Sequence, residues 1–276
     1  QSGPIFRQRT EQGFNCTYGE LHSWRYDTPD GKFWVEKMTY ERFTTNGADV
    51  LIIENKESLS EMESMLVNFE IYRPAYEKLT TDKRKAEFLG LRIGINELLN
   101  GVYEIIYNED GKPCLKNEQL HISLSHSGKW LAIIAHPTKK VGIDIECPAP
   151  KLEKLYKRFL SEVEQEELYK TKNIIKLQIA WSAKEALYKI IGNDAVEFAS
   201  QLRIFDFCIE NNKTLRAQHI PTGMAYELHF KTNNQYTLVY SIAWKMKNNI
   251  YKKILTNYAA KRKMIAILLD PDHCTN

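Results

Sequence analysis

The chain has 276 residues, which is enough for one large domain or two modest ones. Its hydrophobic fraction of 43% and aromatic fraction of 11% are those of a folded protein, which excludes wholesale disorder. With 38 basic and 35 acidic residues the net charge is only +3, which argues against a nucleic-acid partner bound through a global positive field. No apolar run approaches the roughly 18–20 residues that span a membrane, so we expect no membrane partner.

The five cysteines are odd in number, widely scattered and without a CxxC pair. This pattern favours reduced thiols in a cytoplasmic protein over a disulfide framework or a zinc site. Their positions are Cys16, Cys114, Cys147, Cys208 and Cys274.

The N-terminal part of the chain contains few periodic segments. Residues 1–37 carry turn signals without sustained periodicity, and we treat them as an extension of unclear origin. The chain reads as a self-contained domain from Met38, with a short strand predicted over 50–53. Apolar residues at helical spacing predict an amphipathic helix over 59–69. N-cap candidates and a terminal Asn-Gly pair predict a stronger helix over 80–101.

The remaining elements form two blocks, each with helices before strands. Strand-like runs cover 102–107, 121–125, 131–136 and 141–146, with a turn at Asp110-Gly111 between the first two. Helical sequence follows over 152–191, and then strand-like runs over 203–209, 226–230 and 236–244. This order predicts an α+β protein of two similar halves that meet near residue 140. We therefore expect an N-terminal lobe, 38–140, and a C-terminal lobe, 141–246.

The tail, residues 247–276, differs from the rest in carrying a basic cluster and an apolar run that ends in Asp270-Pro271-Asp272. This ending resembles the opening strand of prenylglyceryl-phosphate synthase barrels. The resemblance implies the start of another domain, and a C-terminal accessory strand is the alternative.

The segment Val141–Glu146 combines an apolar and an acidic face. Alternate side chains of a strand share a face, so Asp144 and Glu146 lie together with Gly142, opposite the apolar residues. Two neighbouring carboxylates repel each other unless a cation or base lies between them. Mg²⁺ suits such a pair, since it takes one or two carboxylates plus phosphate oxygens. The alternative is a half-buried strand whose acidic residues face water.

The segment 181–191, WSAKEALYKII, has the apolar spacing of a helix with one buried face. Lys184, Glu185 and Lys189 fall on the other side of this helix. Glu185 and Lys189 have the i, i+4 spacing of an ordinary helix ion pair, worth about 0.3–0.5 kcal/mol. In the functional alternative, Glu185 is a third metal carboxylate and the two lysines stabilise charge beside it.

Together, GIDIE and the WSAKEALYK segment about 40 residues later resemble the paired signature of the 4′-phosphopantetheinyl transferase superfamily. Three intermediate elements agree with this signature: Gly111-Lys112-Pro113, the LSHSG sequence at 124–128, and RFLSEVE at 158–164. The resemblance covers residues 48–246, the length of the two-lobed subfamily typified by the surfactin-synthetase activator.

The resemblance implies a pseudo-dimeric fold of two α/β lobes with the active site between them. It implies a holo-[acyl-carrier-protein] synthase, which transfers the 4′-phosphopantetheine arm of coenzyme A to a serine of an acyl or peptidyl carrier protein and releases 3′,5′-ADP. The implied cofactor is Mg²⁺, with Mn²⁺ as a substitute, and coenzyme A is the co-substrate. The expected partners are coenzyme A and the apo carrier protein, bound by a monomer.

The resemblance also implies the binding residues. The metal carboxylates would be Asp144, Glu146 and Glu185. The side chains that bind coenzyme A would be Arg84, Lys112, Ser125, His126 and Lys184. His126 would contact the 3′-phosphate, from a Ser-His-Ser-Gly turn that can present hydroxyls and N–H groups to an anion.

The catalytic residues implied by the resemblance are Glu185, Lys189 and Glu164. Lys189 would stabilise or protonate the leaving group. Glu164 would take the proton of the carrier serine, with Glu185 or a metal-bound water as alternatives.

Carrier proteins of this family are typically acidic, so the predicted helix over 152–170 is a candidate docking surface. It combines three lysines, at 151, 154 and 157, with an apolar edge of Leu155 and Phe159. A face that is merely solvated is the alternative. Two rival functions also remain: a metal-dependent phosphohydrolase or nuclease, and a catalytically silent scaffold that binds coenzyme A.

Overall fold

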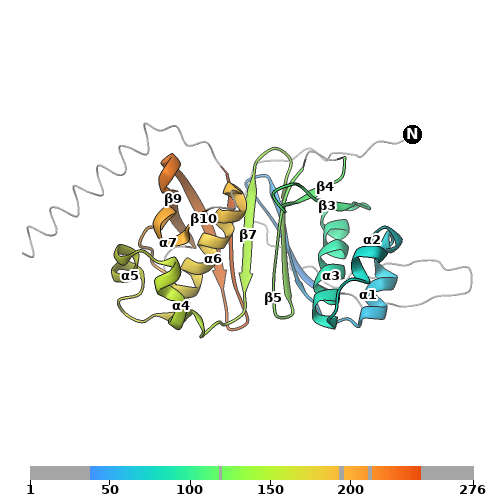
Figure 1. Ribbon diagram of the computed structural model, residues 1–276, viewed down its shortest axis with the longest axis horizontal. Coiled ribbons are helices and arrows are strands. Elements are labelled where there is room, and N and C mark those ends of the chain that lie inside the picture. Colours follow the sequence, from blue (N-terminus) through green and yellow to red (C-terminus); the bar gives the residue numbers. More distant parts are fainter. Residues whose placement is uncertain (1–37, 118–119, 193–195, 211–212, 244–276) are drawn as a thin grey trace, which may run out of the picture.

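The computed structural model describes residues 38–117, 120–192, 196–210 and 213–243 (Figure 1). The predictions for residues 1–37 and 247–276 lie outside these ranges, as do Cys16 and Cys274. The three cysteines within them are free thiols. In this part of the chain no helix is both long and apolar enough to cross a membrane.

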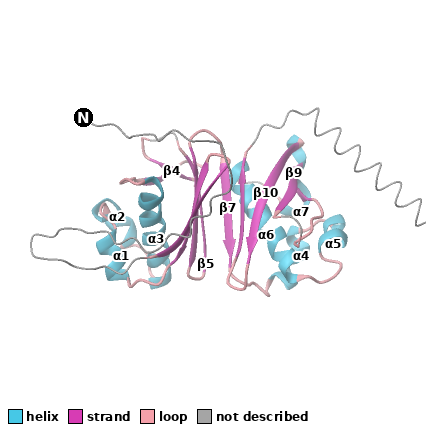
Figure 2. Ribbon diagram, turned by 180° about the vertical axis from the view of Figure 1, so that it is seen from behind, coloured by secondary structure: helices cyan, strands magenta, loops and turns pink. Residues whose placement is uncertain are grey.

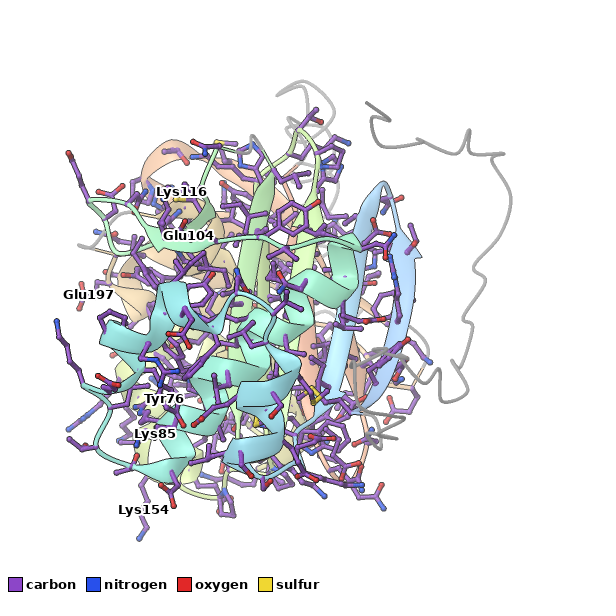
Figure 3. All side chains as sticks on the ribbon, turned by 90° about the vertical axis from the view of Figure 1, so that its right-hand side faces the viewer. Tyr76, Lys85, Glu104, Lys116, Lys154 and Glu197 are labelled. Carbon is purple, nitrogen blue, oxygen red and sulfur yellow. The ribbon has the colours of Figure 1, made fainter. Side chains whose placement is uncertain are left out.

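The first half of the chain builds an antiparallel sheet, here the N-terminal sheet, with strand order β1-β2-β6-β5. Its strands are β1 (Thr39–Thr45), β2 (Ala48–Glu54), β5 (His121–Ser127) and β6 (Trp130–His136). Three helices lie against its outer face (Figure 1): α1 (Leu59–Met65), α2 (Phe69–Tyr76) and α3 (Asp82–Leu99). A small hairpin of β3 (Ile105–Tyr107) and β4 (Pro113–Leu115) stands beside this sheet, and an ion pair between Lys116 and Glu104 braces it (Figure 3).

The second half builds another antiparallel sheet, the C-terminal sheet, with strand order β7-β11-β10-β9-β8. Its strands are β7 (Val141–Glu146), β8 (Leu202–Ile204), β9 (Thr214–His219), β10 (Met224–Thr232) and β11 (Thr237–Ile242). The helical elements are α4 (Leu152–Phe159), α5 (Glu162–Leu168), α6 (Ile174–Ile191), α7 (Phe198–Gln201) and the short 3-10 helix η1 (Ile220–Thr222).

The two sheets pack on each other in the middle of the molecule, and the helices lie on the outside (Figure 2). A buried apolar cluster between the sheets takes Val50 and Ile134 from one and Ile143, Ile145 and Leu238 from the other. The apolar face of β7 thus meets the N-terminal sheet, as the alternation predicts, and its other face meets helix α6. The mixed α/β architecture is confirmed, and the chain passes from the N-terminal sheet to the C-terminal sheet between β6 and β7.

Helix α3 begins and ends where its sequence signals predict. Thr81 is the N-cap, and its side chain accepts a hydrogen bond from the N–H of Arg84. Asn100 ends the helix in the left-handed conformation, with φ of 51°. The prediction of one helix over 59–69 is wrong, because the chain becomes extended at Leu66 and forms two helices, α1 and α2.

Strands β1, β4 and β9 were missed by the sequence analysis. The β1–β2 hairpin did have a local signal, since Asn46 and Gly47 form its turn with φ of 45° and 88°. An Asn-Gly pair between strands is the preferred sequence of a two-residue hairpin turn.

Gly142 brings strand β7 into direct contact with helix α6. A Cβ atom at this position would overlap the backbone carbonyl oxygen of Ala186, which has no rotamer to move away. We expect Gly142→Ala to lower the free energy of unfolding by about 3 kcal/mol, measured by chemical denaturation. Gly111→Ala is the control, because its φ is 72° but nothing lies within 4 Å of the added Cβ. It should cost about 1 kcal/mol, and equal losses in both variants would contradict the expectation.

Candidate active site

Asp144, on β7, lies at the junction of the two sheets, with its side chain 6% exposed. Its Oδ1 accepts hydrogen bonds from Ser125 Oγ at 2.8 Å and from Lys189 Nζ at 3.0 Å. Lys189 also donates to the carbonyl oxygen of Ile143 at 2.8 Å, so it reaches from α6 across to β7. Oδ2 of Asp144 is buried and has no hydrogen-bond partner among the described residues. Oδ1 of Asp144 is therefore fixed by hydrogen bonds, and Oδ2 is available to bind a further group.

Glu146, two residues further on the same face, has both carboxylate oxygens occupied. Oε2 accepts from Ser127 Oγ at 2.8 Å, and Oε1 accepts from Trp181 Nε1 at 3.3 Å. Gln178 Nε2 donates to the backbone oxygen of Glu146 at 3.0 Å. Trp181 and Gln178 thus tie α6 to the end of β7, a role that sequence reasoning missed for both.

Glu185, on α6, interacts electrostatically with both β7 carboxylates. The pKa of Glu185 is raised to about 7, chiefly by burial and also by the negative charges of Asp144 and Glu146, against the opposing effect of Lys189. The structure therefore brings the three predicted metal carboxylates and Lys189 into one electrostatic group.

Asp144, Glu146 and Glu185 form a carboxylate group whose chemistry suits a divalent cation. Asp144 offers an oxygen without a donor, and the charge on Glu185 is disfavoured by burial and by its acidic neighbours. Both features are those of carboxylates whose negative charge is not fully offset by the one ammonium group beside them, that of Lys189. Within the described ranges, however, no three His, Cys, Asp or Glu side chains are arranged as a complete metal site. Mg²⁺ does not need a complete set of protein ligands, since it keeps several waters and binds substrate phosphates.

A basic group borders the carboxylate group. His126, on β5, and Arg84, on α3, meet at Glu87, whose side chain is 7% exposed. Glu87 contacts His126 Nδ1 at 3.3 Å and accepts a hydrogen bond from Arg84 Nη1 at 3.1 Å. The pKa of His126 is lowered chiefly by burial, and Lys189 lowers it further while Glu87 raises it. Sequence analysis missed Glu87, although its i, i+3 spacing from Arg84 was a usable signal.

Lys112, in the turn between β3 and β4, reaches the C-terminal end of α6. Its side chain lies over Gly192, which ends α6 in the left-handed conformation, so closely that a Cβ at Gly192 would overlap Lys112 Nζ. An ammonium group at this position interacts favourably with the helix C-terminus. Burial lowers the pKa of Lys112, and the charge of Lys140 lowers it further.

Lys184 does not lie on the outer side of α6, and that prediction is wrong. Its side chain is 0% exposed, and its Nζ donates to Glu164 Oε2 at 2.8 Å, to Phe198 O at 2.8 Å and to Leu202 O at 2.7 Å. The ammonium group has three protons, and these three bonds use all of them. Lys184 in this position has no donor left for coenzyme A.

Glu164 is buried together with Lys184 and is equally well bonded. Its Oε2 also accepts from the backbone N–H of Ser161 at 2.8 Å, the return bond of a capping box at the start of α5. Its Oε1 accepts from the backbone N–H of Ile204 at 2.7 Å. None of these partners lies on β5 or β7, so Glu164 is held in the interior by bonds to Ser161, Lys184 and Ile204.

The predicted docking helix over 152–170 is divided into α4 and α5. Phe159 is buried in the core and Leu155 is partly buried against it, so only part of the expected apolar edge is exposed. Lys154 does point away from the body of the molecule (Figure 3). The exposed part of the predicted surface therefore combines basic side chains with Leu155, which is partly exposed, and Val163, which is exposed.

Glu185 should make the metal-free protein less stable as the pH rises. Its folded pKa is about 7 against an ordinary 4.5, so the folded state binds its proton more tightly. The free energy of unfolding therefore falls as the pH rises through this window, by about 3 kcal/mol at most. Glu185→Gln cannot ionise and should lose less stability between about pH 5 and about pH 8 in thermal melts with EDTA. Parallel pH profiles of the two proteins would contradict this expectation.

Comparison with known proteins relates the second half of the chain to a known protein family. Residues 140–243 match the model of the 4′-phosphopantetheinyl transferase superfamily. The chain is 28% identical over 130 residues to the 4′-phosphopantetheinyl transferase AcpT of Escherichia coli K12, covering 45% of this chain and 67% of that protein. The AcpT of Salmonella typhi is 28% identical over 123 residues, which are 42% of this chain and 64% of that protein.

A 4′-phosphopantetheinyl transferase of Bacillus subtilis is 34% identical over 88 residues, 30% of this chain and 39% of that protein. The chain thus spans about two thirds or less of the length of these relatives. The matched region contains β7 and α6, which carry the carboxylate group and Lys189. Through residues 140–243, the chain belongs to the 4′-phosphopantetheinyl transferase superfamily.

Proposed function

We propose that this protein is a holo-carrier-protein synthase that transfers the 4′-phosphopantetheine arm of coenzyme A to a serine of an acyl or peptidyl carrier protein. The observation that carries the proposal is the carboxylate group, in which Oδ2 of Asp144 has no partner among the described residues. Lys189 lies within this group, and His126 and Arg84 border it. Coenzyme A carries a pyrophosphate and a 3′-phosphate, so it needs both a cation and basic side chains. The other product is 3′,5′-ADP.

The residues that would hold Mg²⁺, or Mn²⁺ in its place, are Asp144 and Glu185, with Glu146 beside them. When bound, the cation would offset the charge that develops on the pyrophosphate. Lys189 is 26% exposed and already donates to Asp144, so its ammonium group can turn to an oxygen of the leaving group. His126, Arg84 and Lys112 would bind the phosphates of coenzyme A, since guanidinium and ammonium groups suit phosphate oxygens.

The proton of the carrier serine needs an acceptor with a pKa near neutrality. Glu164 is buried and bonded to Lys184, so it lacks access to a docked serine. Glu185 belongs to the carboxylate group, beside the basic side chains that would bind coenzyme A. We therefore assign the acceptor role to Glu185 in place of Glu164.

We further infer that the two sheets with their helices are the two lobes of the surfactin-synthetase-activator-like subfamily, 38–140 and 141–246, in a cytoplasmic monomer. The change of sheet between β6 and β7 supports the boundary, and the functional side chains from β5, β7, α3 and α6 support a site between the lobes.

The test is intact-mass analysis of purified apo carrier proteins after incubation with this chain, coenzyme A and Mg²⁺. We expect a gain of one phosphopantetheine mass that EDTA prevents. Fatty-acid, polyketide and peptide-synthetase carriers should be compared, because each presents a serine as acceptor. A folded protein that binds coenzyme A but modifies none of them would favour the silent scaffold. Phosphate release without a serine acceptor would favour a phosphohydrolase.

A further inference from the structure

Strands β5 and β7 are the facing edges of the two sheets, and serine side chains connect them. The two strands lie side by side in both ribbon views (Figures 1 and 2). The hydroxyl groups of three alternate serines of β5 accept hydrogen bonds from backbone N–H groups. Two of these N–H groups belong to β7 and the third to Cys147, the residue that follows β7. Ile143 N donates to Ser123 Oγ at 3.2 Å, Ile145 N donates to Ser125 Oγ at 3.2 Å, and Cys147 N donates to Ser127 Oγ at 3.1 Å.

Two of these hydroxyls also donate to the carboxylate group. Ser125 Oγ donates to Asp144 Oδ1, and Ser127 Oγ donates to Glu146 Oε2, each at 2.8 Å. Ser123 has no such acceptor at the matching position, because that position is Gly142, which has no side chain. The same strand therefore carries two serines that hold a carboxylate and one that does not.

The bonds of Ser125 limit what it can do. A hydroxyl group has one proton, and Ser125 gives it to Asp144 while it accepts from Ile145 N–H. Its predicted direct contact with coenzyme A is therefore not available in this arrangement. Instead, the bond to Oδ1 fixes the rotation of the Asp144 carboxylate, and Oδ2 is the oxygen left without a partner.

We propose that Ser125 and Ser127 are positioning residues for a divalent cation held by the carboxylate group. The N-terminal sheet would then set the orientation of ligands that all come from β7 and α6. Hydrogen bonds to ligating carboxylates commonly change metal affinity by about 10–100-fold. This inference rests on the metal role assigned under the proposed function.

The test is titration of the full chain with Mn²⁺ alone, followed by electron paramagnetic resonance of the free ion. We expect Ser125→Ala and Ser127→Ala each to weaken Mn²⁺ binding at least about tenfold. Ser123→Ala is the matched control, because it removes the same type of backbone acceptor without touching a carboxylate. It should change Mn²⁺ affinity less than about twofold while still lowering the melting temperature, because its bond to the backbone of β7 is lost. Ser125→Thr, which keeps the hydroxyl, should restore binding.

Several results would overturn the inference. Unchanged Mn²⁺ affinity in Ser125→Ala and Ser127→Ala would do so, and so would an equal loss in Ser123→Ala, which would show a general effect of the sheet junction. Weaker binding of coenzyme A by Ser125→Ala with normal Mn²⁺ binding would assign Ser125 to the nucleotide instead. The titration contains neither coenzyme A nor carrier protein, so this inference stands if the variants behave as expected but no carrier gains mass.

Discussion

Asp144→Asn should reduce the initial rate of carrier-protein modification by about 100- to 1,000-fold without lowering the stability of the metal-free protein. Asparagine has the shape of aspartate and can still accept from Ser125 and Lys189, but it lacks the negative charge. A bound cation is worth several kcal/mol of charge stabilisation, which corresponds to a loss of this size. The measurements are the rate of mass gain with saturating Mg²⁺ and thermal melting with EDTA.

Stability should be kept because the substitution removes a repulsion, and Glu185 remains as a counter-charge for Lys189 when its pair with Asp144 is lost. The charge of Asp144 raises the pKa of Glu185, which means that the two carboxylates repel each other in the folded state. The control is Asp206→Asn, which removes a half-exposed carboxylate paired with Lys176, outside the site. It should keep the full rate. A nearly normal rate for Asp144→Asn would exclude this aspartate as a metal ligand.

Glu164→Gln should lower the free energy of unfolding by about 3–5 kcal/mol, because it leaves the ammonium group of Lys184 buried without its counter-charge. Both side chains are 0% exposed and 2.8 Å apart, and burial already lowers the pKa of Lys184 to about 8. Lys184→Met should be destabilising for the converse reason, since Glu164 would keep its charge in the interior. Chemical denaturation measures both effects.

The double variant Glu164→Gln/Lys184→Met is the decisive comparison. It removes both charges, so it should recover a large part of the stability that each single variant loses. Activity assays well below the melting temperature of each variant show whether the folded variant has lost catalysis. A Glu164→Gln protein that is as stable as the wild type but inactive would return the role of serine base to Glu164.

The sequence by itself determined the features that depend on neighbours in the chain. The caps at Thr81 and Asn100 fixed the ends of α3, because a side-chain oxygen and a left-handed residue satisfy backbone groups locally. Alternation placed Asp144 and Glu146 on one face of β7, and the paired motifs identified the family that the comparisons support for residues 140–243. The mixed α/β class followed from the order of the elements.

Only the tertiary structure decided what lies opposite each face. Helical periodicity predicted one buried side for α6, yet ten of its residues are buried, among them Lys184. The reason is that α6 packs on β7 through one face, at Gly142, and toward α7 and β8 through another, at Lys184. Because α6 is covered on more than one side, the spacing of its apolar residues does not show which face is exposed.

The partners of the polar residues were equally beyond the reach of the sequence. Glu87 with His126 and Ser125 with Asp144 are contacts between elements far apart in the chain. Motif spacing shows which residue types are present, but not which hydroxyl or carboxylate each one meets. That choice depends on how the two sheets align at β5 and β7, because a shift of one residue would turn the serines away from the carboxylates.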